Sequence, residues 1–301
     1  MDTQTLKYIG KDLYKTHILK EWKRYIVFMT RCHLHKGQIN DLLDFFKATP
    51  QRQAMLEHTT SFVEQTTRAF FYKDSTWDER IAIVKNHIEY MENIFNDEAI
   101  AKLYVNGERI RLWEDVYEEQ PVVMELWFHG GQRKEGCLSL VLSLGADELY
   151  QIMFWLAPSP EDNELSLWIG ALQGTPNGSE IIKGLTKAFF GYRTKNLIFY
   201  GIRNVAAGLG CKHLYAVSNA GYYAMNHVRR DRKLKTSLDD FWQECEGQVC
   251  KDQRFFEMPI EEYRKFMEEL KPSKRAQHRR RFAKMDEITE SVTEVLNNYK
   301  K

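Results

Sequence analysis

The first part of the chain has the hydrophobic periodicity of amphipathic helices. Apolar residues recur at three- and four-residue spacing in residues 41–46 and again in residues 77–88, as they do along the buried face of a helix. Thr76 is followed three residues later by Glu79, which is the spacing of a capping box at the start of a helix. The pattern predicts a helical region over residues 1–120, without an obvious reactive centre.

At Pro121 the pattern changes to that of β-strands. Four β-rich stretches follow, and the turns between them contain glycine or proline, the first at Gly130 and Gly131. The stretches cover residues 122–129, 137–144, 148–156 and 165–172. Because links this short cannot cross over to a parallel neighbour, the four stretches predict an antiparallel meander.

Helical periodicity then returns and leads into one more strand. Residues 179–190 and 196–209 predict two helices, and Gly210 is suited to end the second of them. The short apolar stretch 213–217 predicts a strand directly after a helix, and a strand–helix–strand crossover favours parallel pairing. The last elements expected are a helix at 238–246, a strand at 254–258, a helix at 260–270 and a basic helix that begins at Pro272.

The predicted fold class is therefore α+β. A helical region, residues 1–120, precedes a mixed α/β domain, residues 121–301, whose sheet combines the antiparallel meander with one parallel crossover strand and is flanked by helices.

The composition limits where the protein can be located and which partners it can bind. The chain is 43% hydrophobic and 28% charged, and its net charge is only +1, so binding of a polyanion requires local clustering of cations. The N-terminus lacks a signal-peptide pattern, and no apolar run reaches the length that spans a bilayer. The five cysteines are scattered, and neither a CxxC nor an HExxH pattern occurs, so neither a disulfide framework nor a metal site is favoured. We expect a cytoplasmic protein.

Several phrases in the second half of the chain resemble a known family. They occur at residues 168–174, 185–197, 216–219, 241–242, 255–259 and 272–282. In order and spacing they resemble the VirK/YbjX family, although Phe190 and Thr194 stand where that family tends to carry His and Pro. The resemblance implies a bacterial protein associated with virulence, with resistance to cationic antimicrobial peptides and with the cell envelope. It does not imply a defined reaction.

The order of meander, helical segment and strand also resembles the core of GNAT acyltransferases. This resemblance implies a donor such as acyl-CoA, acyl carrier protein or aminoacyl-tRNA, held between two splayed strands that end near Leu172 and Val217. Residues 173–178 and 191–196 are the two loops that precede helices, where phosphates bind well. Neither loop matches the Q/R-x-x-G-x-G/A fingerprint. Arg193, Lys195 and Asn196 are the candidate phosphate-binding residues, and the alternative is a solvated loop with a helix cap.

The same comparison suggests catalytic residues. Gln173, Ser218 and Asn219 lie at the ends of the two predicted central strands. The side chains that could exchange protons with an acceptor amine or a leaving thiolate are Tyr215, Tyr222, Glu125 and Glu148. The alternative is that the tyrosines are buried structural residues and that the glutamates face solvent.

Residues 271–284 contain seven cations. Lys274, Arg279 and Arg280 are the candidates for binding phosphate groups, whether on nucleic acid, transfer RNA, lipid head groups or a carrier. A noncatalytic factor that binds an anionic partner through this helix is the alternative to the transferase. A third interpretation is a solvated helix whose charges pair with Glu261, Glu262, Glu268 and Glu269.

Overall fold

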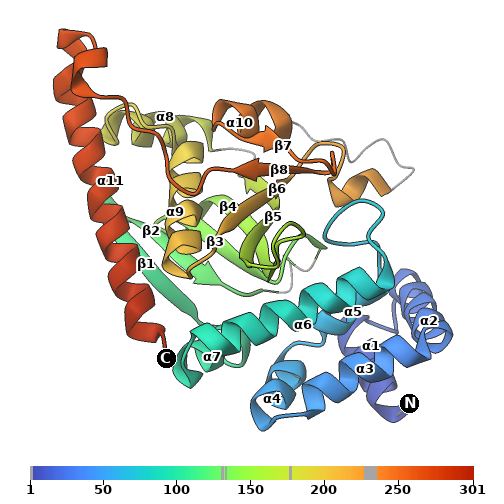
Figure 1. The fold of residues 1–301 in the computed structure, drawn as a ribbon. Helices are drawn as coiled ribbons and strands as arrows, with labels where there is room; N and C mark the ends of the chain where they lie inside the picture. The colour runs from blue at the N-terminus through green and yellow to red at the C-terminus, as the bar shows by residue number, and fades with distance from the viewer. Residues whose placement is uncertain (1–2, 130–131, 133, 176–177, 227–235) are drawn as a thin grey trace.

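In the computed structural model, residues 3–129, 132, 134–175, 178–226 and 236–301 are described (Figure 1). Seven helices form the N-terminal part of this structure. They are α1 (Thr3–Leu13), α2 (Leu19–Leu34), α3 (Lys36–Lys47), α4 (Pro50–His58), α5 (Ser61–Thr67), α6 (Trp77–Ile94) and α7 (Asp97–Tyr104). The capping box predicted for α6 is confirmed, because the Thr76 hydroxyl accepts from the Glu79 N–H while the Glu79 carboxylate accepts from the Thr76 N–H.

The helices end at Tyr104, and the sheet already begins at β1 (Arg109–Tyr117). The prediction that the chain stays helical to residue 120 is wrong for this stretch. Ile110 and Leu112 are buried while Arg111 between them is exposed, the alternation of a strand with one buried face. The division of the chain into two domains stays a prediction.

The predicted meander is confirmed. Strands β1, β2 (Gln120–Trp127), β3 (Leu138–Leu144), β4 (Asp147–Pro158) and β5 (Leu165–Gly174) pair antiparallel in sequence order. The crossover strand β6 (His213–Val217) pairs parallel with β5, also as predicted. Strands β8 (Phe255–Met258) and β7 (Gln248–Val249) complete the sheet in the order β1-β2-β3-β4-β5-β6-β8-β7.

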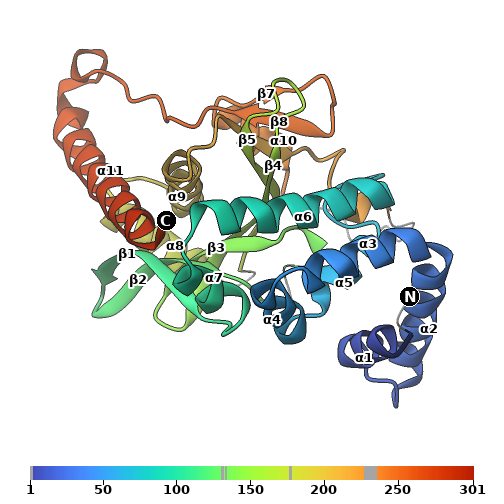
Figure 2. The same ribbon diagram turned by 60° about the horizontal axis from the view of Figure 1, so that its bottom comes forward.

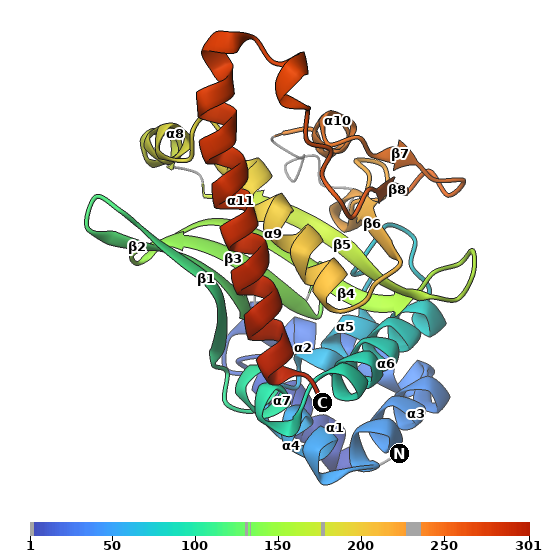
Figure 3. The same cartoon turned by 60° about the vertical axis from the view of Figure 1, so that its left-hand side comes forward.

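Helix α9 (Thr194–Gly208) covers one face of this sheet. Gly201 lies against the side chains of Met124 of β2 and Leu140 of β3, which would have to move to admit a larger residue. Helix α11 (Pro272–Tyr299) runs along α9 and β1. Helices α8 (Ser179–Ala188) and α10 (Leu238–Glu244) appear on either side of its upper half in Figure 3. The face that carries Leu140 is therefore the face closed by α9.

The predicted helix at 260–270 is wrong. Only Met267–Glu269 forms a short 3-10 turn, and the rest runs in an open course from β8 to the far end of α11 (Figure 3). A helix advances only about 1.5 Å per residue, whereas an extended chain advances about 3.3 Å. The extended form is also held by side chains, because Glu262 accepts hydrogen bonds from Tyr192 and Arg203.

The end of α11 returns to the helical region. The Asn96 N–H donates to the Tyr299 carbonyl (2.8 Å), the Lys301 N–H donates to the Ile94 carbonyl (3.0 Å), and Phe95 pairs with Lys300. These bonds fix the junction between α6 and α7 to the last residues of the chain. Within the described residues, no helix is both long and apolar enough to cross a membrane.

Candidate functional site

Strand β5 carries a bulge at Gly170. On β4, Phe154 pairs with Ile169 and Met153 pairs with Ala171, so Gly170 has no opposite residue. The pairing of β5 with β6 ends at Ile169, although β5 continues to Gly174. The last part of β5 has therefore left β6, and a bulge of this kind re-aims the side chains that follow it.

Glu135 fills the space beside this bulge. Its carbonyl oxygen lies directly over Gly170, and its carboxylate accepts from Gln173 Nε2 (3.0 Å) and from the Tyr222 hydroxyl (3.1 Å). The side chain is 4% exposed. Burial raises the pKa of Glu135 to about 7, against smaller opposing effects of Tyr222, Lys134, Tyr223 and Gln173.

Burial also raises the pKa of Tyr222, and the charge of Glu135 adds to the effect. The phenol therefore stays protonated at neutral pH, next to a carboxyl group that exchanges its proton near neutral pH. Such a pair is what acid–base chemistry requires.

More polar residues continue from Gln173 across the sheet. Gln151 of β4 is opposite Gln173, so both side chains lie on one face. Gln151 Nε2 lies 2.6 Å from His129 Nε2 and 2.8 Å from Ser139 Oγ, and the Ser139 hydroxyl donates to Gln132. Burial lowers the pKa of His129, so this histidine is neutral at pH 7. We call this set the polar row; it comprises His129, Gln132, Glu135, Ser139, Gln151, Gln173 and Tyr222.

An aromatic cleft of about 770 Å³ lies farther along the same face. Trp155 is two positions further along β4 from Met153, and it pairs across the strands with Trp168, which pairs in turn with Tyr215. The other aromatic walls are Tyr72 and Phe255. Gly170, covered by Glu135, separates Trp168 of the cleft from Gln173 of the polar row.

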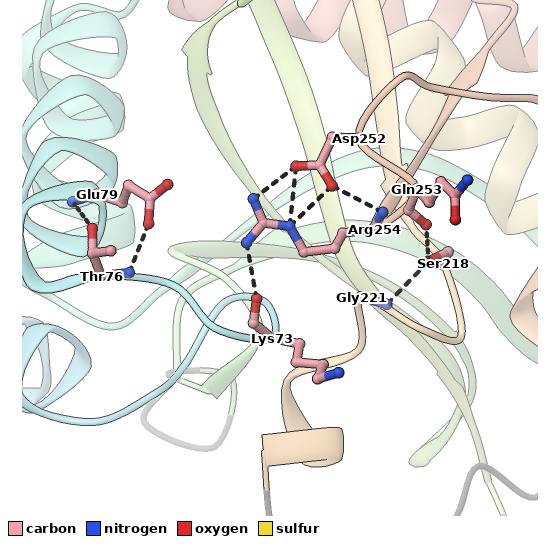
Figure 4. A network of polar contacts seen from close by, with 8 residues as sticks. All are labelled: Lys73, Thr76, Glu79, Ser218, Gly221, Asp252, Gln253 and Arg254. Carbon is pink, nitrogen blue, oxygen red and sulfur yellow. Dashed lines mark hydrogen bonds and ion pairs between the residues drawn. The ribbon is translucent and has the colours of Figure 1, made fainter.

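An ion-pair network forms the rim of the cleft (Figure 4). Arg254 makes a bidentate bond to Asp252 and donates to the Lys73 carbonyl (3.0 Å). Glu79, which also lines the cleft, caps α6. Arg254 and Glu79 therefore already have partners where they line the cleft.

Comparison with known proteins identifies the family. The family model described as a protein of unknown function (DUF535) matches residues 17–294. The chain belongs to the DUF535 family. It is 22% identical over 269 residues to an uncharacterized protein of Haemophilus influenzae, with 87% of each chain covered. It is 31% identical over 129 residues to the uncharacterized protein YbjX of Escherichia coli, which covers 41% of this chain and 38% of that one. These matches support the VirK/YbjX resemblance. No solved structure matches the chain.

Of the catalytic residues expected in this DUF535 protein, the structure brings Gln173 and Tyr222 together at Glu135. Ser218 and Asn219 lie in the turn after β6. The Ser218 hydroxyl donates to the Gln253 carbonyl and accepts from the Gly221 N–H (Figure 4), and Asn219 bonds to Ser237, Leu238 and Asp239. These contacts build the turn and start α10.

The other expected acid–base residues lie away from Glu135. Tyr215 lines the aromatic cleft, stacks on Trp168 and shares a hydrogen bond with Ser159 (3.1 Å). Glu125 bonds to Arg109 and Arg111, and Glu148 bonds to Arg109. These carboxylates neutralise arginines of β1.

The structure describes one of the two expected phosphate-binding loops completely, and the candidate side chains of that loop already contact other residues. Arg193 pairs with Glu244 (2.6 Å), and Lys195 Nζ lies 3.8 Å from the centre of the Phe241 ring. Asn196 Nδ2 lies 3.9 Å from Cys245 Sγ. In the other loop, residues 176–177 lie outside the described residues.

The cations of α11 fall into two groups. Arg281 donates to the Phe190 carbonyl, Arg275 donates to the Leu270 carbonyl, and Lys284 pairs with Asp115 and Glu287. Lys271, Arg279 and Arg280 are exposed without a pairing acid among the described residues, and the exposed Lys274 donates to Gln277 (3.4 Å). All of them lie on the α9 side of the sheet, opposite the polar row.

Sequence reasoning missed Glu135. It lies in a loop after Gly130 and Gly131, and nothing in its local sequence shows that it folds back onto β5. Ser139, Gln151 and Gln173 gave a usable signal, because each is a polar residue on a strand that is otherwise largely apolar. Three such residues on adjacent strands predict a shared polar site when the register is known.

Proposed function

We propose that this protein is an acyltransferase of GNAT-like design in which Glu135 is the general base. The observation that carries the proposal is the buried Glu135 carboxyl group, with a pKa of about 7, held by Gln173 and Tyr222 where β5 leaves β6. A general base works best when its pKa is near the working pH. The meander, the bulge at Gly170 and the parallel strand β6 support the likeness to GNAT enzymes.

The proposed reaction transfers an acyl group from a thioester to an amine. The amine nitrogen attacks the thioester carbonyl, and Glu135 accepts the proton that the nitrogen loses. The carbon–sulfur bond breaks as the proton held by Glu135 passes through the Tyr222 hydroxyl to the leaving thiolate, so that no free phenolate forms. The products are an amide and a free thiol, and neither residue is consumed.

Both substrates have a place in this scheme. The thioester arm of acyl-CoA, acyl carrier protein or an equivalent carrier enters where β5 diverges from β6. An aminoacyl-tRNA would bring an ester in place of the thioester. The acceptor binds in the aromatic cleft on the same face of β5. In keeping with the VirK/YbjX resemblance, we propose an amine, a peptide or an envelope precursor as the acceptor.

The test measures release of free thiol from a panel of acyl-CoA donors with amine acceptors. The Glu135→Gln variant should lose at least about 100-fold of the rate, the usual contribution of a general base. Glu64→Gln is the matched control, since Glu64 is 2% exposed but lies in α5 and bonds to Tyr14. If Glu135→Gln and wild type turn over a donor equally, the assignment of the base is wrong. If no donor in the panel reacts or shifts the melting temperature, the transferase proposal fails.

A noncatalytic anion-binding role of α11 is the second candidate. Lys271, Lys274, Arg279 and Arg280 are exposed, whereas two of the acids expected to pair with them bond to other residues. Glu262 accepts from Tyr192 and Arg203, and Glu269 accepts from Tyr263 and the Phe266 N–H. Exposed cations without acid partners favour a phosphate-bearing ligand, a nucleic acid for example.

A further inference from the structure

Helix α2 exposes an apolar stripe. Ile18, Trp22 and Ile26 follow one another at four-residue steps, and Leu19 lies beside them. Their exposed fractions are 44%, 47%, 41% and 68%, respectively, while Phe28 and Cys32 of the same helix are buried in the core. Large apolar side chains exposed in a continuous row indicate a surface that binds something.

The same helix is basic. Residues 15–31 contain five basic residues and one acidic residue, a formal charge of +4, although the whole chain carries only +1. Lys15, Lys20, Lys23 and Arg24 are exposed. Helix α2 lies at the outer edge of the molecule, away from the sheet (Figure 2). A flat surface can therefore approach it without meeting the rest of the protein.

A small cavity lies on the side of α2 away from the stripe. It has a volume of about 200 Å³, and four of its lining residues are the cations Lys23, Arg24, Arg31 and Arg68. Arg24 is paired with Glu21 (2.5 Å), Arg31 donates to the Thr67 carbonyl (3.1 Å), and Arg68 lies 3.5 Å from Glu64. Burial and the neighbouring Arg68 lower the pKa of Arg31. The basic side of α2 therefore lies away from its apolar stripe, as in a helix with one polar and one apolar face.

We infer that α2 is a docking surface for an anionic lipid bilayer. The stripe of Ile18, Leu19, Trp22 and Ile26 enters the interface, and the exposed cations Lys15, Lys20 and Lys23 attract the helix to the anionic head groups. Helices that lie in a membrane surface combine a Trp- and Leu-bearing face with a Lys- and Arg-rich face in this way. This inference is independent of the proposed acyl transfer, which uses the polar row on the sheet.

Charge decides between a bilayer and a second copy of the chain. A symmetric dimer formed through α2 would bring Lys20 and Lys23 of one copy near the same residues of the other copy, and like charges at a contact oppose association. An anionic surface attracts these residues instead. The apolar stripe likewise favours lipid over nucleic acid, whose backbone offers no apolar layer.

The test is sedimentation with vesicles of phosphatidylcholine, with or without phosphatidylglycerol. We expect wild type to bind only the vesicles that contain phosphatidylglycerol. Lys20→Glu/Lys23→Glu should bind at least about 25-fold more weakly, because each basic residue near such a surface contributes about fivefold. Leu19→Ser should bind about tenfold more weakly, because an apolar side chain no longer enters the interface.

Two controls separate this role from general charge and from folding. Lys183→Glu/Lys187→Glu makes the same charge change on exposed residues of α8 and should bind like wild type. The fluorescence of Trp22, taken as the difference between wild type and Trp22→Phe, should shift to shorter wavelength with the anionic vesicles. Equal vesicle binding by wild type and by the α2 variants would overturn the inference. So would an α2-dependent dimer in a protein that binds no vesicles.

Discussion

The carbonyl oxygen of Glu135 lies so close over Gly170 that the position admits no side chain. A Cβ at residue 170 would overlap this oxygen and would also press on Trp155. The contact fixes Glu135 to the bulge of β5, and it joins the polar row to the aromatic cleft. Gly170→Ala should therefore destabilise the fold by about 3 kcal/mol, because a backbone segment must move. Denaturant unfolding measures this loss.

Gly37→Ala is the matched control for that experiment. Gly37 lies in α3, and nothing lies within 4 Å of the Cβ that alanine would add. The control should be neutral or slightly stabilising, since alanine favours helix over glycine. Equal stability of the two variants would show that the Glu135 segment is loosely held.

Glu135 should make stability depend on pH. Its pKa rises from an ordinary 4.5 to about 7 on folding, so the folded state binds the proton more tightly than the unfolded state. The resulting stabilisation is complete below pH 4.5 and is lost as the pH rises through 7. At about 1.4 kcal/mol per pH unit, the change amounts to about 3 kcal/mol. Urea unfolding between pH 5 and 8 measures this change, which should be absent from Glu135→Gln.

Tyr222→Phe should raise the pKa of Glu135 above 7. The Tyr222 hydroxyl donates to the carboxylate and so favours its charged form. Carbon-13 NMR of the labelled Glu135 carboxyl group follows the titration directly. Tyr150→Phe serves as the control, because Tyr150 is a partly buried tyrosine of β4 that has no bond to Glu135. A pKa that stays at about 7 in Tyr222→Phe would show that burial alone sets it.

Arg280 and Arg281 are neighbours on α11 with different expected roles. Arg281 donates to the Phe190 carbonyl, at a residue with positive φ, whereas Arg280 is exposed. Arg281→Ala should reduce the free energy of unfolding by about 1–2 kcal/mol, and Arg280→Ala should change it by less than about 0.5 kcal/mol. If α11 binds a phosphate-bearing partner, Arg280→Ala weakens binding of a short oligonucleotide while stability is unchanged. Equal thermal stability of the two variants would contradict the division of the α11 cations.

The sequence predicted the elements that local patterns determine. The four meander strands, the crossover strand β6 and the capping box of α6 follow from alternation, short turns and spacing. Strand β1 was missed because it lies directly after helices, and its burial depends on pairing with β2. The segment 260–270 was assigned to a helix because its local composition does not reveal the distance that the chain must cover to reach α11.

The candidate site was only partly predictable for the same reason. Gln173 and Tyr222 could be placed near strand ends, but the partner that unites them comes from a loop far earlier in the chain. The pKa of Glu135 is raised by burial and lowered by hydrogen bonds from Tyr222 and Tyr223, and no local sequence pattern records either effect.

The bonds between residues 94–96 and 299–301 determine the order in which this molecule can be completed during synthesis. A ribosome makes α6 and α7 roughly 200 residues before their last backbone partners. Until those partners emerge, the Asn96 N–H and the Ile94 carbonyl must be hydrated, and the joint between α6 and α7 stays open to solvent. Contacts between residues so distant in sequence form slowly, because a long loop must be closed first. Nascent chains stalled before residue 299 should therefore be cleaved by protease at this joint, and release of the full chain should protect it.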